Sequence, residues 1–552
     1  MRYKQQVVVA IVTGLIGLTA CVVALPGRAH GAITASCASH VQITGIQKWA
    51  SWNAVAVLPD GNYAVAGSFS GAADFPPALT STSNSQDAVV AKIDAATCSA
   101  IWVRTLSGSG YAYGFGVATD AAGSIYATGQ FSAPGTIGNI TLTNRGLNDA
   151  WVAKWSSAGD LLAAWSLGGA SSDGANAILV RDGRVYVAGW TAGPWNAGGG
   201  MIPGGTGRAG TAFVAVYTSD AGNFLDEVHW DSPKNEIAWA LDMDAARNLL
   251  VGGTFGGTSD PPGATIDFNG GSAVSGGITL VSAGEADIWL ANLDSTLDHA
   301  LWARRFGGTS SDALGGIELD AAGNLYVAGS FRGAATGAVS ETCTTGDGCL
   351  VLMSLDAAGV KRWSHSWSAA SPLADVALDV AVSGDRVWMT GMLVNALDFG
   401  TGPLTPGGAY DAFAAQFDLA GNATGAVRWP SAFTDRGKAL AAVGSGVVAV
   451  GQFYDSIDFG CAGCVFQRQP STSGEGWIAR LTDGVVPPTV PPIATLTPQP
   501  IATATNTEIP TVPPRTPTWT RTVVPTATLP AGCAPGTPVS CPEGSHPWQP
   551  PQ

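Results

Sequence analysis

The strongest constraint on this chain is a sequence unit that recurs seven times between about residues 40 and 484. Each copy contains a strand with a Val-Ala-Gly end or a variant of it, and these ends lie 60 to 76 residues apart, at Gly67, Gly129, Gly189, Gly253, Gly329, Gly391 and Gly451. A second strand opens, usually on an acid, at Asp87, Asp149, Thr211, Asp287, Asp347, Asp411 and Glu475. A tryptophan follows the first six openings, at Trp102, Trp165, Trp230, Trp302, Trp363 and Trp429, and Trp49 takes the same place at the N-terminus. This regular spacing indicates a repeat architecture.

Each unit reads as four short strands. In the copy around residues 287–331, the turn at 320–324 is Asp-Ala-Ala-Gly-Asn, which suits a tight turn because Gly and Asn accept left-handed backbone conformations. Sheets this small bury their faces only against neighbours. A single core also stops growing near roughly 250–300 residues. The sequence therefore predicts an all-β fold, a seven-bladed β-propeller of four-stranded antiparallel blades spanning residues 33–484.

The two ends of the repeat region complement each other. The first unit begins with a lone strand from Val41 to Trp49, and the last ends at Gly476–Leu481 with no strand after it. A linear solenoid would need capping repeats instead. We therefore expect the N-terminal strand to become the outer edge of the last blade and close the ring.

These motifs resemble the bacterial SBBP repeat, named for the seven-bladed beta-propeller. The resemblance rests on Gly-Gly-x-x-x-Asp, Asp-x-x-Gly-Asn-Leu-Tyr-Val-Ala-Gly and Asp-Ala-Phe-Val-Ala, and covers nearly all of residues 40–484. It is looser in the sixth unit, where the turn begins at Ser383, and in the fourth, which carries a long insert. The resemblance implies a secreted or cell-surface bacterial protein and says almost nothing about a substrate.

The N-terminus predicts export. Arg2 and Lys4 precede an uncharged stretch, and small residues follow near Ala32, which is the order of a secretory signal peptide over residues 1–32. Two alternatives stay open. The segment ending at Cys21 resembles a lipoprotein cleavage site, and the uncleaved apolar run is long enough to anchor the chain in a bilayer.

The cysteine count suits an exported protein. After Cys21, the remaining eight are even in number, which favours disulfides. Proximity in sequence favours three pairs and leaves a fourth by elimination: 343–349, 461–464, 533–541 and 37–98, that is Cys343, Cys349, Cys461, Cys464, Cys533, Cys541, Cys37 and Cys98. The Cys461–Cys464 motif also fits zinc or redox chemistry, but no second ligand pair of usual spacing accompanies it.

The composition changes abruptly beyond residue 484. Residues 485–552 contain 18 Pro with abundant Thr, which favours extended polyproline II and cannot build a core. We expect residues 485–532 to form a disordered stalk or linker, and residues 533–552 a short cysteine-containing tip.

Composition excludes some partners and supports no particular reaction. The net charge of −15 would repel nucleic acids and anionic membranes. The sequence contains no Gly-x-Ser-x-Gly, HExxH or Walker motif. A Gly-x-Gly-x-x-Gly segment at 205–210 precedes a strand and not a helix, so a nucleotide role is not expected.

One set of acids is a candidate ligand site. Five units carry an acid about five residues before the centre of the innermost strand, at Asp173, Glu236, Asp312, Asp375 and Asp435. Together these carboxylates could bind calcium or a sugar near the mouth of the central channel. The alternative, which the repetition of the position favours, is that each acid accepts N–H groups in its own loop.

Aromatic residues supply a second set of candidates. The tryptophan that recurs once per unit is best explained by packing between blades. The unrepeated Tyr111, Tyr113 and Trp195 are better candidates for stacking on sugars. The sequence as a whole favours a monomeric, exported, non-catalytic module that binds an extracellular protein or glycan, with no resident cofactor. Two alternatives are an extracellular lyase or hydrolase using acids of the channel mouth, and a purely structural spacer.

Overall fold

Strand-forming residues dominate the part of the chain that this computed structural model describes. Runs rich in Val, Ala, Trp, Phe and Tyr form strands between turns of Gly, Asp and Asn, and the described residues contain no helix. The all-β prediction is confirmed. The structure describes residues 32–484 apart from the internal stretches 41–42, 75–78, 82–85, 203–209, 231–234, 258–262, 269–276, 338–340, 344–347, 368–374, 406, 408, 461–464 and 468–471.

Several predictions from sequence fall outside these described residues: residues 1–31 of the predicted signal peptide, the stalk at 485–532, the tip at 533–552 and most of the glycine-rich segment 205–210. Within the described ranges we find no helix long and apolar enough to cross a bilayer.

The strands form four-stranded antiparallel sheets that repeat along the chain, and we call the strands of each sheet a, b, c and d from the inside outward. The first sheets are β2 (Ile43–Val57), β3 (Tyr63–Ala73), β5 (Asp87–Ile93) and β6 (Ala100–Gly108); β7 (Ala112–Thr119), β8 (Ile125–Phe131), β11 (Asp149–Trp155) and β12 (Leu161–Gly169); and β13 (Asp173–Arg181), β14 (Arg184–Thr191), β17 (Thr211–Thr218) and β18 (Phe224–Trp230).

The series continues in the same strand order. It comprises β19 (Glu236–Met243), β20 (Leu249–Gly256), β23 (Ala286–Leu293) and β24 (Ala300–Gly307); β25 (Ala313–Leu319), β26 (Leu325–Phe331), β29 (Cys349–Leu355) and β30 (Lys361–Trp367); β31 (Val376–Ser383), β32 (Arg386–Leu393), β35 (Asp411–Asp418) and β36 (Ala423–Trp429); and β37 (Arg436–Val443), β38 (Gly446–Phe453), β41 (Thr472–Gly484) and β1 (Ala32–His40).

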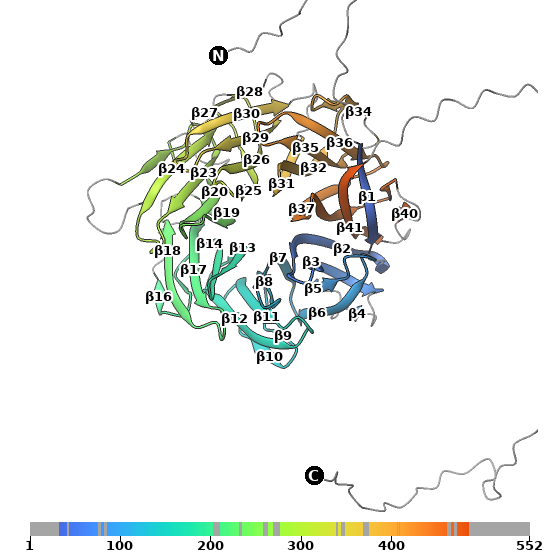
Figure 1. Cartoon of the computed structure of the whole chain (residues 1–552). Helices are drawn as coiled ribbons and strands as arrows, with labels where there is room; N and C mark the ends of the chain where they lie inside the picture. Colours follow the sequence, from blue (N-terminus) through green and yellow to red (C-terminus); the bar gives the residue numbers. More distant parts are fainter. Residues whose placement is uncertain are drawn as a thin grey trace, which may run out of the picture. The chain divides into compact units, whose positions relative to one another are not determined.

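The sheets lie side by side around a common axis with strand a innermost, as Figure 1 shows. Each strand a contacts the next, and β37 contacts β2. The apolar core is divided into clusters, each between neighbouring sheets. Small sheets packed radially in this way define a β-propeller.

Short hairpin strands fill most of the b–c connections. They are β4 (Leu79–Thr80), β9 (Gly135–Ile137), β10 (Ile140–Leu142), β15 (Trp195–Asn196), β16 (Met201–Ile202), β21 (Thr265–Asp267), β22 (Thr279–Val281), β27 (Ala334–Gly337), β28 (Glu341–Thr342), β33 (Leu397–Asp398), β34 (Pro403–Leu404), β39 (Ser456–Asp458) and β40 (Val465–Gln467). Apolar residues in and next to these hairpins pack against the outer strands of the sheets. Phe268, for example, contacts both Trp230 and Trp289, with ring centroids 5.5 and 5.3 Å apart.

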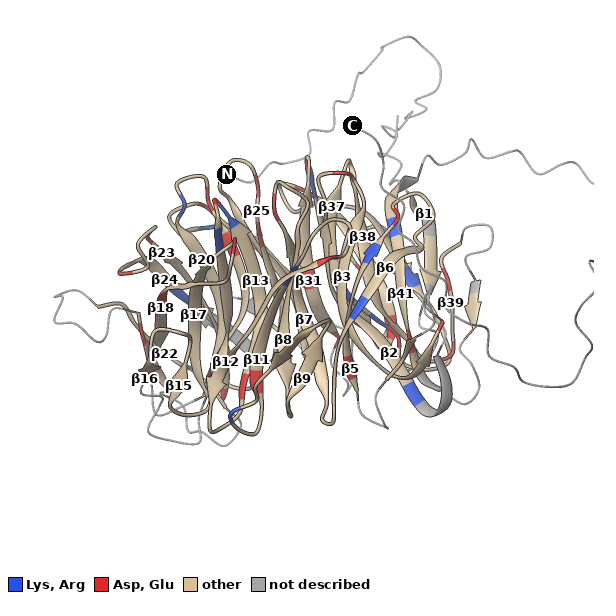
Figure 2. Ribbon diagram, turned by 90° about the horizontal axis from the view of Figure 1, so that it is seen from below, with Lys and Arg blue, Asp and Glu red and all other residues tan. Residues whose placement is uncertain are grey.

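The a–b turns follow from their Asp-x-x-Gly-Asn sequence. Asp320 Oδ1 accepts the N–H groups of Ala322 (2.9 Å) and Asn324 (2.8 Å), and Gly323 takes a φ of 80°. Because strands within a sheet alternate in direction, the a–b and c–d turns lie at one face of the ring, and the b–c and d–a connections lie at the other, which we call the loop face. Figure 2 shows the strands running between these two faces, with few charged residues along most of their length.

The tryptophan on strand d packs between neighbouring sheets, which confirms the packing prediction for Trp302. Its indole N–H donates to the carbonyl of Ala357 in the next sheet's c–d turn (2.9 Å). Gly359 of that turn lies so close to the indole that an added Cβ would be 2.7 Å from the ring. Trp102 makes the same contact with the carbonyl of Ser157 (3.1 Å).

The outer partner of β41 is β1, with Ala32 opposite Gly484 and His40 opposite Trp477. The prediction that Val41 to Trp49 would take this position is therefore wrong. Trp49 belongs to β2, the innermost strand of the first sheet, and pairs in parallel with Gly474 of β41. The small alternating residues of β1 suit an edge strand, whereas Trp49 only resembled the tryptophan of strand d.

Candidate functional site at the axial surface

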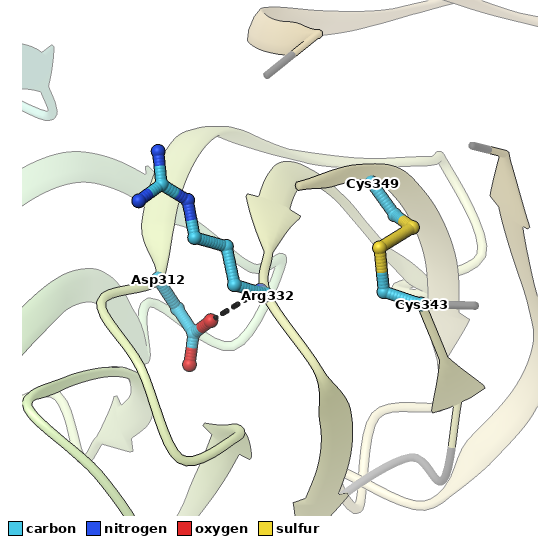
Figure 3. The surroundings of a disulfide bond; sticks show 4 residues. All are labelled: Asp312, Arg332, Cys343 and Cys349. Atoms are coloured by element: carbon cyan, nitrogen blue, oxygen red, sulfur yellow. Dashed lines mark hydrogen bonds between the residues drawn. A yellow bond between two sulfur atoms is a disulfide. The ribbon is translucent and has the colours of Figure 1, made fainter. Parts of the chain in front are cut away.

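The five acids predicted from the repeat are buried at the start of strand a, in separate sheets: Asp173, Glu236, Asp312, Asp375 and Asp435. Asp312 shows what such a carboxylate does. Its Oδ2 accepts the N–H of Gly308 (2.8 Å) and its Oδ1 accepts the N–H of Arg332 (3.0 Å), as Figure 3 shows for Arg332. The carboxylate thereby ties the d–a connection to the end of strand b.

Other members of the set bind their own loops in the same way. Asp173 accepts the N–H of Gly169 (2.6 Å), and its other oxygen accepts the hydroxyl of Thr191. Asp375 accepts the N–H of Val394 (2.7 Å), and Asp435 accepts the N–H of Tyr454 (3.0 Å). Across the described residues, no three His, Cys, Asp or Glu side chains are grouped so that they could hold a metal ion. In these contacts the acids accept hydrogen bonds from nearby loops, which is the alternative that the sequence favoured.

The sequence did not reveal that several of these acids are paired. Near the start of β23, the carboxyl group of Asp287 lies close to that of Asp312, and the guanidinium of Arg305 lies 2.7 Å from Asp287 Oδ2. Burial, with the negative charge of Asp287 adding to it, raises the pKa of Asp312 to about 7. Gly307 lies between the two carboxyl groups, and an added Cβ there would collide with both.

The same arrangement recurs at two other sheet boundaries. Burial and the charge of Asp173 raise the pKa of Asp149 to about 6. Burial and the charge of Asp411 raise the pKa of Asp435 to about 7, and Arg428 holds Asp411 at 2.7 Å. Each pair therefore retains a proton under mildly acidic conditions.

The axial surface of the ring is formed by a β-bulge that occurs at the same position of strand a in each sheet. A bulge inserts one extra residue and redirects its side chain. Because both faces of strand a pack against neighbouring sheets, the extra side chain is directed toward the axis. These bulge residues are Asn53, Phe115, Asn176, Trp239, Gly315, Leu378 and Lys438.

On one side of the axis, polar bulge residues of two neighbouring strands are connected to each other and to the backbone of a third strand. The ammonium of Lys438 on β37 donates to Ser51 Oγ and Asn53 Oδ1 of β2, both at 2.8 Å. Asn53 Nδ2 in turn donates to the carbonyl of Gly114 on β7 (2.8 Å). The β37, β2 and β7 side of the axial surface is thus one continuous polar network.

Next to this network lies a row of aromatic rings that we call the aromatic ladder: Tyr111, Tyr113 and Phe115. Successive ring centroids are 5.5 and 5.6 Å apart. Tyr111 is 38% exposed, and its hydroxyl donates to Asn148 Oδ1 (2.7 Å). The sequence identified the two tyrosines but missed Phe115, because its direction depends on the bulge.

Trp195 does not belong to this surface. It is fully buried in the hairpin of β15, with its ring centroid 4.4 Å from that of Phe213. Its ring is enclosed and offers no face to a ligand, so the structure separates it from the two tyrosines.

The opposite side of the ring carries carboxylates nearer the a–b turns. Asp242 accepts the N–H of Leu319 (2.7 Å), and Asp379 accepts the N–H of Leu440 (2.8 Å). The side chain of Glu318 forms no hydrogen bond with the described residues. Burial, and then the charges of Asp242 and Asp379, raise the pKa of Glu318 well above its usual value. Glu318 was not a candidate in the sequence because its neighbours, Asp242 and Asp379, belong to other sheets and lie far from it in the sequence.

One predicted disulfide is present. Cys343 and Cys349 are bonded and close the b–c connection beside Asp312, as Figure 3 shows. Strand c of this sheet begins at Cys349, two residues after the predicted opening at Asp347. Cys98 is also disulfide-bonded. Its predicted partner is Cys37, and the side chains of the following cysteines lie outside the described residues: Cys37, Cys461, Cys464, Cys533 and Cys541.

Comparison with known proteins identifies no family. No family model and no curated protein matches the chain. Similar solved structures include two quinohemoprotein alcohol dehydrogenases, ADHIIG from Pseudomonas putida HK5 (9% identity, 85% of this chain and 78% of the other, TM-score 0.38) and one from Comamonas testosteroni (10%, 82% and 76%, 0.37). A third is the endosialidase of phage phi92 (9%, 86% and 72%, 0.37). We assign this protein to the β-propellers from the arrangement of its own sheets.

Proposed function

We propose that this chain is an exported, seven-bladed β-propeller that binds an extracellular glycan on its axial surface without catalysing a reaction. The ring is closed by β1, and the glycan lies over the aromatic ladder and the polar residues of β37 and β2. The protein acts at the cell surface or after secretion, as a monomer.

Two contacts support ring closure. The pairing of β1 with β41 gives the last sheet its fourth strand from the opposite end of the chain. Lys438 and Asn53, which are 385 residues apart, are hydrogen-bonded at the axis. Both contacts join the first sheet or its leading segment to the last, as a closed ring requires.

The aromatic ladder is the observation that carries the glycan proposal. The apolar face of a sugar ring stacks on an aromatic side chain, while its hydroxyl groups need nearby donors and acceptors. The ladder provides the rings, and Asn53 provides a polar side chain next to them. Among the positions of the other sheets equivalent to Tyr113 and Phe115, only Trp239 on β19 is aromatic, so a row of three rings is not part of the repeat.

The N-terminal sequence and the cysteines support export. The signal-like N-terminus and the even cysteine count favour an oxidising compartment. The disulfide between Cys343 and Cys349 fits that environment. A Pro/Thr-rich stalk would hold the propeller away from its attachment point.

A glycan array tests the proposal. The full chain is applied to neutral and acidic oligosaccharides, beside the variants Tyr113→Ala and Tyr410→Ala. Tyr410 lies outside the ladder, before β35, and serves as a matched control. We expect binding to one glycan class, reduced about tenfold or more in Tyr113→Ala and unchanged in the control. Equal binding by both variants, or no binding by the native chain, would refute the proposal.

Glu318 favours one alternative function, a glycoside hydrolase or lyase. A carboxyl group with a strongly raised pKa and two neighbouring carboxylates is the arrangement that a general acid requires. Four of the five buried acids bind backbone N–H groups of nearby loops, so Glu318 takes the place of these acids in this hypothesis. Release of reducing or unsaturated ends from a bound glycan, lost in Glu318→Gln, would establish the enzyme. Binding without any cleavage would exclude it for that glycan.

A further inference from the structure

Two cations on β37 have no anionic partner in the part of the chain that the structure describes. Arg436 and Lys438 occupy the positions that Tyr113 and Phe115 occupy on β7, as the strand registers show. Among the described residues, neither side chain forms an ion pair, and the ammonium of Lys438 is held only by the neutral oxygens of Ser51 and Asn53. This is unusual in a chain with a net charge of −15, where carboxylates are plentiful.

Arg436 is also short of hydrogen bonds. Its Nε is buried and lacks an acceptor, and its side chain makes no hydrogen bond to the described residues. A buried donor without an acceptor costs on the order of 1–3 kcal/mol, so such groups are usually satisfied by a ligand, a water or a neighbouring chain. An anion between Arg436 and Lys438 would satisfy both the donor and the charge.

The pKa of Lys438 also reflects its burial and its position beside Arg436. Burial, and then the positive charge of Arg436, lower the pKa of Lys438 to about 8. A bound anion would oppose both effects by supplying a negative charge at hydrogen-bond distance. The two cations lie one strand away from the aromatic ladder, since β2 contacts both β37 and β7.

We infer that the glycan bound at the axial surface is acidic, and that Arg436 and Lys438 bind its anionic group while the aromatic ladder stacks on a sugar ring. This inference rests on the proposed function. A guanidinium offers parallel N–H donors that match a carboxylate or a sulfate ester, and the ammonium adds a third donor from β37. Asn53 lies between these cations and the ladder and is placed to bind a hydroxyl group.

Calorimetric titration of the full chain tests the inference. The probes are an oligogalacturonate, the same oligosaccharide with its carboxyl groups methyl-esterified, and a sulfated neutral oligosaccharide of similar length. We expect the native chain to bind one anionic form about tenfold or more tighter than the ester. The variants Arg436→Gln and Lys438→Met should each remove most of that preference.

Lys361→Gln, an exposed cation on the outermost strand β30, is the matched control and should behave as the native chain does. Melting temperatures show whether each variant is folded. If Lys438→Met unfolds, Arg436→Gln still decides the question, because its side chain makes no hydrogen bond that the change would break. The choice between uronate and sulfate identifies the anionic group.

Native-strength binding of the anionic probes by Arg436→Gln, or equal binding of acid and ester by the native chain, would overturn the inference. Binding of the ester that depends on Tyr113 would then leave the proposed function standing. No binding of any probe, with no effect of Tyr113→Ala on the glycan array, would instead count against the proposed function itself.

Discussion

At the residue scale, the same aspartate position serves both the fold and the pH response of the protein. Asp312 holds two loop N–H groups, so the carboxyl group must be buried where those loops meet. Burial beside Asp287 makes full ionisation of both groups costly. The guanidinium of Arg305 contacts the carboxylate of Asp287 at 2.7 Å, next to this carboxyl group. The repeated Gly-Gly before the acid is explained by Gly307, which leaves space for both carboxyl groups.

These pairs predict that stability falls as pH rises from about 5 to 7. The folded form holds protons on Asp312 and Asp435 up to a pKa of about 7, whereas the unfolded chain releases them near 4. Raising the pH therefore lowers the free energy of unfolding, by up to about 1.4 kcal/mol per pH unit for each such group. Carboxyl groups with lowered pKa values, such as Asp320, act only at lower pH. Urea unfolding at pH 5, 6 and 7 measures the effect.

Asp312→Asn gives the control for this prediction. Asn cannot titrate, so the variant should show a shallower decrease over the same pH range. A native protein whose unfolding midpoint is constant or rises from pH 5 to 7 would contradict the assignment of shared protons.

At the element scale, the turn and strand patterns could be predicted because each rests on local chemistry. The Asp-x-x-Gly-Asn turns and the tryptophan of strand d behave as their sequences indicate. The N-terminal strand could not be placed in the same way, since Trp49 resembles that tryptophan while the pairing of β1 is decided by the edge of β41. Bulges are also invisible in sequence, because they depend on the register of two strands.

Packing of strand d against the next sheet predicts a steric cost at Gly359. Gly359→Ala should lower stability by about 2–4 kcal/mol, because the residue has a φ of 70° and its new Cβ would press on Trp302. Gly384→Ala is the control, with a φ of 61° and open space around it, and should cost only about 1 kcal/mol. Denaturant unfolding measures both changes, and equal losses would contradict the packing role.

The pairing of β1 with β41 predicts that a chain starting at Val41 folds poorly. Removing residues 32–40 exposes the edge of β41 and opens the last sheet. We expect a large decrease in melting temperature or the loss of a cooperative transition. Removing residues 485–552 should leave the melting temperature unchanged, since the sequence assigns them to the stalk and tip. A chain from Val41 that melts as the native chain does would argue against closure by β1.

At the scale of the whole molecule, repeated residues build the ring and unrepeated residues distinguish one side of it from another. The β37, β2 and β7 side carries Lys438, Asn53 and Phe115, whereas Glu318 lies on the opposite side. Sequence reasoning reached Tyr111 and Tyr113 because they break the repeat. It could not reach Lys438 or Arg436, which come close to the ladder only because β2 contacts both β37 and β7.

The central claim is that the axial surface binds a glycan between β37, β2 and β7. A crystal structure of the full chain soaked with an oligosaccharide that binds in solution tests this directly. We predict a sugar ring stacked on Tyr113 or Phe115, with its polar groups within hydrogen-bond distance of Asn53 and Lys438. A glycan bound on the outer strands, or against Glu318 with the ladder unoccupied, would contradict the account.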